Sequence, residues 1–251
     1  MIPLEVIAAS VDDCIVAEQN GANRIELVSA FEVGGLTPSL GLLINARQAT
    51  RLPIMAMVRP RAGGFCYTAN EYVAMQRDAE LLLAHGADGL VFGCLQTDGA
   101  IDAARTKWFV DAALGRTAVF HRAFDLTPDP LAALDQLLAL GVTRVLTSGQ
   151  AETALLGAEA IVSFRAYVGA ALEVMPGAGI TPATVLQVMR RTGADQVHAS
   201  LSGGRIDPSA ARPTSVRIGH TDAGARVRTL DGAQVREVRR LLDDFDAKQL
   251  H

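Results

Sequence analysis

The sequence predicts an α/β protein whose whole chain, residues 1–251, folds as a single (β/α)8 TIM barrel. Eight short apolar runs alternate with longer segments that suit helices, an order typical of βαβ units around a parallel sheet. A glycine-centred junction recurs before every second run, which indicates a repeated unit. The length of 251 residues is close to the roughly 250 that such a barrel needs, although it also suits two smaller domains.

The predicted strands are short and rich in apolar residues. The segments between them leave room for one helix and two loops each time. A doubly wound sheet usually has fewer strands, so this number favours the barrel. We expect strands at 4–8, 24–29, 54–59, 89–95, 118–125, 144–148, 172–175 and 196–200.

The recurring junctions consist of a glycine, a short polar turn and a strand. They are centred on Gly21, Gly86, Gly141 and Gly193, and each glycine is expected to end a helix. They precede the second, fourth, sixth and eighth strands, so a βαβα unit used four times would explain them. The alternative is that helix–glycine–strand junctions look alike in any α/β protein.

Helix starts support this division of the chain. Residues 10–13 and 68–71 have the form of capping boxes, in which a hydroxyl residue is followed by an acid three positions later. Thr–Pro pairs at 37–38, 127–128 and 181–182 suggest a threonine N-cap with proline at the first helical position.

The fifth predicted strand, 118–125, carries the chemistry around which the rest is arranged. Val119, His121, Ala123 and Asp125 share one face of an extended chain. His121 and Asp125 would then lie together at the carboxyl end of the strand. A TIM barrel keeps its chemistry at that end, so both are candidate catalytic residues.

Alternation in the other strands also points ionisable side chains into the barrel. Glu5, Glu26, Arg59 and His198 take inward positions on four different strands. A buried charge is expensive unless it is paired, and convergence from separate strands is typical of an active site. The architectural alternative is that Glu5 and Glu26 only neutralise Arg59. The candidate catalytic residues are therefore His121, Asp125, His198 and Glu26.

Two glycine-rich turns, 175–180 and 200–205, follow the seventh and eighth strands. Loops in these places often bind phosphate through backbone N–H groups, and nearby arginines would add charge. Glycines also make tight turns that bind nothing. The candidate anion-binding residues are Arg59, Arg61, Ser148, Gly177, Gly179, Ser200 and Gly203, with Arg205 as an alternative cation.

Composition and charge exclude several classes of partner. The formal net charge is -4, and no basic stretch suggests nucleic acid. Apolar runs fall well short of the roughly 18 residues of a membrane span. Residues 1–5 lack the basic start of a signal peptide, so we expect cytoplasmic residence.

The region after the eighth strand is the least regular. Residues 201–228 are rich in Ser, Gly, Pro and Arg and have no clear periodicity. We expect a long loop here, lying over the barrel mouth or moving freely. A last helix is expected at about 231–245.

Several of these motifs, taken together, resemble the CutC family, called copper homeostasis proteins. The resemblance implies a TIM barrel, a cytoplasmic location, homodimers or higher assemblies, and a role in copper handling with copper(I) as the bound metal. It runs in order through about residues 4 to 200 and rests on 24–27, 34–39, 59–61, Phe65, Tyr67, 88–93, 121–125, 146–149, 175–180 and 197–200.

The chain departs from the family pattern at its soft metal ligands. Family members often carry cysteines in the first two strands, where this sequence has Ile7 and Val28, and Ala62-Gly63-Gly64 replaces a Gly-Gly-Asp turn. Copper(I) prefers thiolate and thioether ligands, so Cys66 and Cys94 are the remaining candidate metal ligands. Buried lone cysteines also serve simply as packing.

Two functions therefore compete. One is copper homeostasis, by resemblance. The other is a TIM-barrel enzyme acting on a small anionic metabolite that bears a phosphate or carboxylate. In it His121 and His198 would exchange protons, Asp125 would assist, and the arginines would clamp the anion.

Two further alternatives remain. A divalent metal held by His121, His198 and a carboxylate is a variant of the enzyme hypothesis. A scaffold that acts through oligomer surfaces would show no response to small molecules at all.

Overall fold

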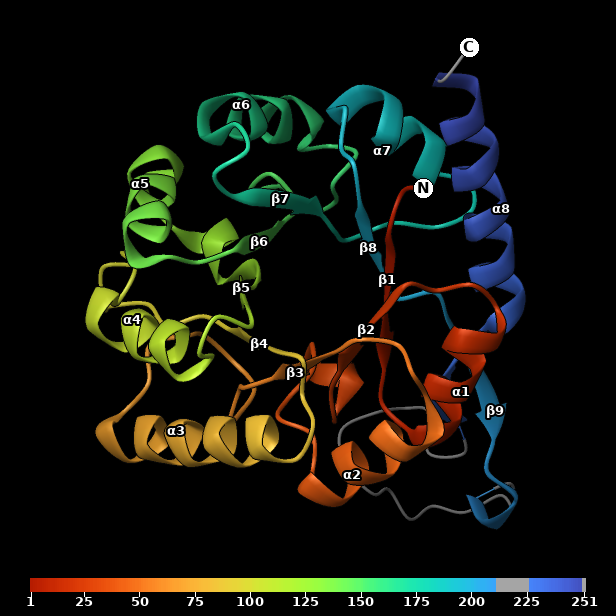
Figure 1. The fold of residues 1–251 in the computed structure, drawn as a ribbon, viewed down its shortest axis with the longest axis horizontal. Coiled ribbons are helices and arrows are strands. Elements are labelled where there is room, and N and C mark those ends of the chain that lie inside the picture. The colour runs from red at the N-terminus through yellow and green to blue at the C-terminus, as the bar shows by residue number, and fades with distance from the viewer. Residues whose placement is uncertain (211–225, 250–251) are drawn as a thin grey trace.

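The computed structural model describes residues 1–210 and 226–249 and confirms the (β/α)8 barrel. Eight parallel strands follow one another in the hydrogen-bonded order β7-β6-β5-β4-β3-β2-β1-β8. Figure 1 shows the helices as an outer ring around them. The strands are β1 Leu4–Ala8, β2 Arg24–Leu27, β3 Ile54–Met57, β4 Gly89–Phe92, β5 Thr117–Phe120, β6 Arg144–Thr147, β7 Glu173–Pro176 and β8 Val197–Ala199.

Eight α-helices alternate with these strands in the described part of the chain. They are α1 Val11–Gln19, α2 Leu40–Ala49, α3 Ala69–Ala84, α4 Ala103–Ala112, α5 Pro130–Leu140, α6 Ala158–Val168, α7 Val185–Thr192 and α8 Gly232–Gln249. Across residues 1–210 and 226–249, none of them combines the length and apolarity needed to cross a membrane.

The predicted capping box at 68–71 is confirmed, and at 10–13 only its N-cap half forms, because Asp13 accepts the N–H of Ala9 and not that of Ser10. The predicted Thr–Pro caps are wrong. The Ser10 hydroxyl accepts the Asp13 N–H at 3.0 Å, and Thr68 and Glu71 form a reciprocal box. At the Thr–Pro pairs the helix begins two or three residues later: Ser39 and Asp129 cap the first two helices with their side chains, and Thr184 holds the N-cap position of the third without a side-chain bond to the helix. Asp129 is the better cap than Thr127 because its carboxylate accepts two N–H groups of the first turn.

The glycine junctions are confirmed. Gly21, Gly86, Gly141 and Gly193 all have positive φ, between 60° and 106°. This is the left-handed conformation that ends a helix and that other residues adopt only with strain.

The fifth strand ends earlier than predicted, and this moves Asp125 off the strand. β5 stops at Phe120, and Arg122–Leu126 forms a 3-10 helix, η2. Local hydrogen bonds turn the chain there: the N–H of Ala123 donates to His121 Nδ1, and the N–H of Phe124 donates to the His121 carbonyl, both at 3.1 Å. The prediction that His121 and Asp125 share one strand face is therefore wrong.

Alternation along the strands divides the core into two clusters. The larger cluster packs outward-facing strand residues such as Leu4, Ile25 and Leu90 against the helices. A smaller apolar cluster fills the inside of the barrel: Val28, Met55, Met57, Val91, Val119, Leu146 and Met175. This inner cluster forms a packed floor below the carboxyl ends of the strands.

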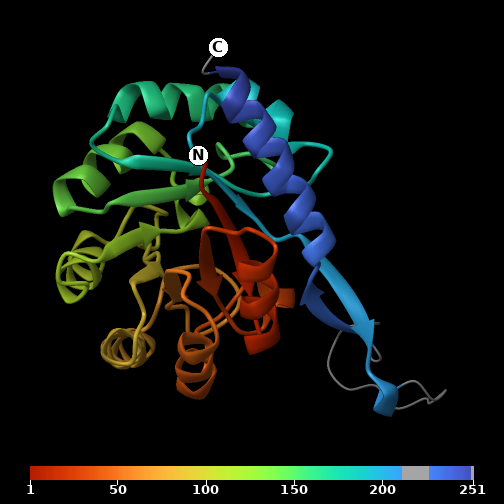
Figure 2. The same ribbon diagram turned by 45° about the vertical axis from the view of Figure 1, so that its right-hand side comes forward.

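The region expected to be a loop at 201–228 instead contains a β-ribbon. β9, Ser202–Ile206, pairs antiparallel with β10, Arg226–Leu230, and the loop prediction is wrong there. Residues 211–225 of the predicted loop lie outside the described residues. Figure 2 shows the ribbon projecting away from the barrel. The N–H of Leu230 donates to buried Asp13 Oδ1 at 2.8 Å, which anchors the base of the ribbon to α1.

Candidate functional site

A cavity of about 300 Å³ opens at the carboxyl ends of the strands, above the inner apolar cluster. Its wall is mainly apolar, and its polar groups come from separate strands and loops. The lining residues are Ile7, Glu26, Val28, Phe31, Val33, Gly34, Gly35, Met57, Arg59, Phe65, His121, Arg122, Leu146, Ala178, Gly179, Ile180, His198 and Ser200. A largely apolar pocket with a few converging polar groups is the usual form of a small-molecule site.

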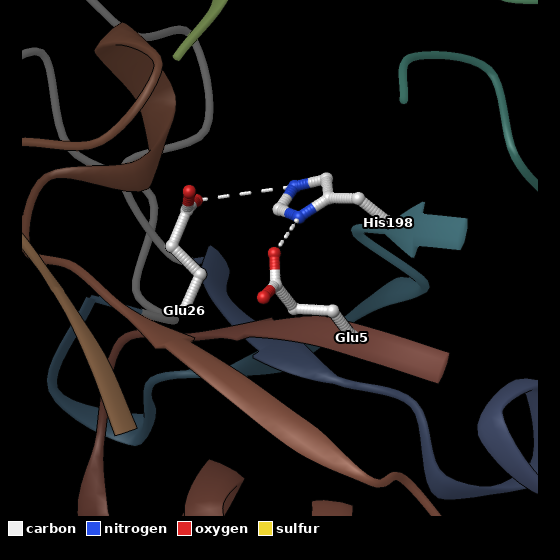
Figure 3. Close-up of side chains that lie close together, drawn as sticks. All are labelled: Glu5, Glu26 and His198. Atoms are coloured by element: carbon white, nitrogen blue, oxygen red, sulfur yellow. Dashed lines mark hydrogen bonds and ion pairs between the residues drawn. The ribbon is translucent and has the colours of Figure 1, made fainter. Parts of the chain in front are cut away.

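Three buried ionisable side chains lie together (Figure 3), and two of them, Glu26 and His198, line this cavity. Glu5, Glu26 and His198 come from the adjacent strands β1, β2 and β8, at the inward positions that alternation predicts. His198 Nδ1 lies 2.7 Å from Glu5 Oε1, and His198 Nε2 lies 3.9 Å from Glu26 Oε2. The imidazole therefore stands between two carboxyl groups, one tightly bonded and one looser.

Glu5 is the fixed anion of this cluster. Burial opposes its charge, but the Arg24 guanidinium and the hydrogen bond from His198 prevail and lower its pKa to about 2. Burial likewise lowers the pKa of His198, and the carboxylates of Glu26 and Glu5 outweigh it, so the pKa is raised overall. The two carboxylates thus favour the cationic form of His198.

Glu26 is the carboxyl group of this cluster whose charge can change near neutral pH. Its side chain is 3 % exposed, and burial raises its pKa to about 7 despite the nearby His198. Its Oε1 has no hydrogen-bond partner among the described residues. A carboxyl group that changes charge near neutral pH and has a free oxygen beside a cavity is suited to exchange protons with a bound molecule.

His121 also lines the cavity but is uncharged. Burial, reinforced by the positive charge of Arg59, lowers its pKa to about 3. Its ring packs against Phe65, with 4.7 Å between the ring centroids. The structure does not bring His121 into one ligand group with His198, because the group of possible metal ligands in residues 1–210 and 226–249 is Glu5, Glu26 and His198.

Asp125 and Ser148 lie together beside the cavity rather than in its wall. Asp125 accepts hydrogen bonds from the Ser148 N–H at 3.1 Å and from Arg122 Nε at 2.8 Å. Ser148 Oγ accepts a second bond from Arg122 at 2.8 Å. The two residues thus fix the guanidinium of Arg122 at the cavity rim. Arg122 lines the cavity, although an extended strand would have pointed it to the face opposite His121.

The two predicted anion-binding arginines have different surroundings. Arg59 lines the cavity, but its guanidinium donates to the carbonyls of Val33, Gly35 and Gly63 at 2.8–3.0 Å, so it holds two loops together. It contributes positive charge to the cavity wall, but these bonds to loop carbonyls keep its guanidinium from closing on an anion as predicted. Arg61 lies outside the cavity, where it pairs with Glu71 at 2.5 Å.

The glycine-rich turns contribute only in part. Gly179 and Ser200 line the cavity, whereas Gly203 lies in the projecting ribbon. Gly177 lies against the floor, since a Cβ there would come within 2.6 Å of Leu146 Cδ1. The loop after the second strand also reaches the cavity, and its aromatic wall residue Phe31 lies in the 3-10 helix η1, Phe31–Val33. Arg228 Cζ lies 3.7 Å from the centroid of the Phe31 ring. This contact joins distant segments, so no local sequence pattern predicts it.

The predicted metal ligands Cys66 and Cys94 do not lie together at the cavity. Cys66 is exposed, Cys94 is buried with its thiol pKa raised by burial to about 12, and neither lines the cavity. The cavity offers one thioether, Met57, among oxygen and nitrogen donors. This donor set does not fit copper(I), which prefers thiolates and thioethers.

Comparison with known proteins places the chain in a family. A model described as the CutC family matches residues 2–203. A family protein CutC of Treponema denticola is 48% identical over 218 residues, 87% of this chain and 89% of that one. The copper homeostasis protein cutC homolog of Mus musculus is 38% identical over 243 residues, 96% of this chain and 89% of the mouse protein.

A crystal structure of a CutC protein from Streptococcus agalactiae agrees with this assignment. It superposes with a TM-score of 0.76 at 32% identity and covers 80% of this chain and 99% of that chain. The resemblance noted in the sequence motifs is thus confirmed by whole-chain similarity. The chain belongs to the CutC family.

Proposed function

We propose that the chain is an acid–base enzyme that acts on a small anionic molecule bound in the barrel mouth. The observation that carries this proposal is the Glu26 carboxyl group, which is buried, has an unpartnered oxygen, and faces a cavity beside the cationic His198. Its pKa of about 7 makes both the acid and the base form available at neutral pH.

The charges of the wall favour an anion. Arg59, Arg122 and His198 line the cavity as cations, and Glu26 is the one carboxyl group among the lining residues of the described chain. When Glu26 is protonated the wall is positive, so it attracts a carboxylate or phosphate. The apolar remainder of the wall suits a carbon skeleton.

Glu26 and His198 divide the chemistry between them. Glu26 in its ionised form takes a proton from the bound molecule, and in its neutral form returns one. The carboxylates of Glu26 and Glu5 raise the pKa of His198 and so favour its cationic form, in which the Nδ1–H donates to Glu5 Oε1 at 2.7 Å and the positive charge stabilises the Glu26 carboxylate.

Anion binding should weaken as Glu26 ionises. Benzenesulfonate is a suitable probe because its own charge is constant between pH 5.5 and 8.5. We expect its affinity to fall about tenfold or more across this range, since the carboxylate repels the anion in a site of low dielectric. In Glu26→Gln, a neutral isostere, the fall in affinity across this range should be clearly smaller than in the wild-type chain, as measured by isothermal titration calorimetry.

The matched control is Glu80→Gln, which alters a carboxyl group on the exposed face of α3. It should keep the pH dependence of the wild-type chain. The same pH dependence in Glu26→Gln as in the wild type would show that Glu26 does not govern the site.

Copper homeostasis is the second candidate function, favoured by the name of the mouse relative. In that role the chain would bind copper(I) as its cofactor, and the exposed thiol of Cys66 is the accessible soft donor. Cys94 is shielded from solvent and holds its proton, so we give it no part.

A copper(I) competition titration of the reduced chain against a chelator checks this candidate. Any stoichiometric uptake should disappear in Cys66→Ser and persist in Cys94→Ser. Uptake that survives in Cys66→Ser would place the metal elsewhere. If the chain does not compete with the chelator at all, it does not bind copper(I).

We also propose cytoplasmic residence and a homodimer. Three free cysteines suit a reducing compartment. The β9–β10 ribbon projects from the barrel and exposes Ile206 at its edge, a surface that a second copy of the chain could cover. Neither proposal bears on the chemistry of the cavity.

A further inference from the structure

The hydrogen bonds of His121 fix where its proton lies. Its Nδ1 accepts the backbone N–H of Ala123 at 3.1 Å. A neutral imidazole has one acceptor and one donor nitrogen, so the proton must be on Nε2. His121 therefore presents an N–H group and not a lone pair on its other side.

That N–H group has no partner. His121 Nε2 is buried, and no hydrogen-bond acceptor reaches it among residues 1–210 and 226–249. The side chain is 4 % exposed and lines the cavity. A buried donor without an acceptor costs free energy, and an oxygen atom of a molecule in the cavity would satisfy it.

The imidazole is also held rigidly. A Cβ on Gly93 would lie 2.4 Å from His121 Cε1, so the absence of a side chain there makes room for the ring. Phe65 packs on the ring, and the cation of Arg59 nearby disfavours a second proton. Burial and Arg59 together keep the pKa at about 3, which agrees with a group that donates a hydrogen bond and does not titrate.

We infer that His121 is a fixed, neutral hydrogen-bond donor to a carbonyl oxygen, and that the substrate is a small carbonyl compound bearing an anionic group. This inference rests on the proposed function, because it names the substrate class of the same site. It also revises the expectation that His121 exchanges protons itself.

The inferred donor and Glu26 together support one reaction, the transfer of a proton from carbon. Glu26 in its carboxylate form takes a proton from the carbon next to the carbonyl group. The electron pair of that C–H bond forms a C=C bond to the carbonyl carbon while the π pair of C=O moves onto oxygen, which gives an enolate. The Nε2–H of His121 stabilises the oxyanion, and Glu26 returns its proton to the carbon skeleton in the second half of the reaction.

The tautomer is tested by NMR of the full chain with ¹⁵N-labelled histidine between pH 5 and 8. We expect His121 as the neutral Nε2–H form throughout, whereas His198 carries both protons at the acidic end. His121→Phe and His121→Gln identify the resonance. A protonated His121 or the Nδ1–H form overturns the inference.

Titration with 2-oxobutanoate and phenylpyruvate tests the ligand class. The His121 Nε2–H resonance should shift on binding, and His121→Phe should weaken binding about tenfold or more. His85→Phe, at an exposed histidine, is the control and should bind as the wild type does. If neither keto acid binds, or if one binds without moving this resonance, the carbonyl class is overturned.

The two proposals fail separately. If Glu26 stays ionised from pH 5 upward while His121 is the Nε2–H form and responds to keto acids, the acid–base function fails and the donor site stands. If Glu26 titrates near pH 7 and His121 does not respond, the donor site fails and the acid–base function stands.

Discussion

Replacing Glu5 by alanine should destabilise the fold by about 3–5 kcal/mol, the usual cost of removing one partner from a buried ion pair. Glu5 is 1 % exposed and bonds both Arg24 and His198. Without it two cationic groups would face each other in the barrel with no carboxylate between them. The expected result is a marked fall in the urea midpoint of the Glu5→Ala variant.

A matched variant separates burial from charge. Glu80→Ala also removes a carboxylate from an ion pair, but Arg77 and Glu80 are 74% and 51% exposed, so its cost should stay below about 1 kcal/mol. Equal midpoints for Glu5→Ala and Glu80→Ala would mean that the buried cluster does not stabilise the barrel.

Stability should fall as pH rises from about 4.5 to 7, because folding raises the Glu26 pKa from 4.5 to about 7. In this window the folded chain holds a proton that the unfolded chain releases, so the stability present below pH 4.5 is lost as pH rises. The change is at most about 3 kcal/mol, since one pKa unit corresponds to about 1.4 kcal/mol. His198, whose pKa is also raised, adds loss in the same direction above pH 6.5.

Glu5 acts in the opposite sense at lower pH. Its pKa is lowered from 4.5 to about 2, so its contribution is present above pH 4.5 and is lost as pH falls to 2. Urea unfolding at a series of pH values should therefore give greatest stability at mildly acidic pH. Glu26→Gln should flatten the curve between pH 4.5 and 7, and an unchanged slope in that variant would contradict the assignment.

Strand alternation predicted the buried half of the site. Glu26 and His198 lie inside the barrel as expected, because a two-residue period leaves only two faces and the apolar neighbours occupy the outer one. The order of helices and strands was predictable for a different reason. The junction glycines and the capping box at 68–71 mark helix ends through local chemistry.

Arg59 was also placed at the cavity by alternation, but the contacts that hold the rim of the site could not be predicted in this way, because they join distant segments. Arg59 is held by carbonyls of two loops, and Arg122 by Asp125 and Ser148 after the strand period has ended. The β9–β10 ribbon was missed because 226–230 alternates only in part, with Arg228 and Thr229 adjacent, and because its partner strand contains two glycines.

Direct titration of the Glu26 carboxyl group tests the central claim, that a proton-exchanging carboxylic acid faces the cavity. The chain labelled with ¹³C at glutamate Cδ is followed by NMR from pH 4 to 9, with Glu26→Gln identifying the resonance. We expect a carboxyl group that is protonated at pH 5 and ionises near pH 7. A Glu26 that is already ionised at pH 5 would contradict it.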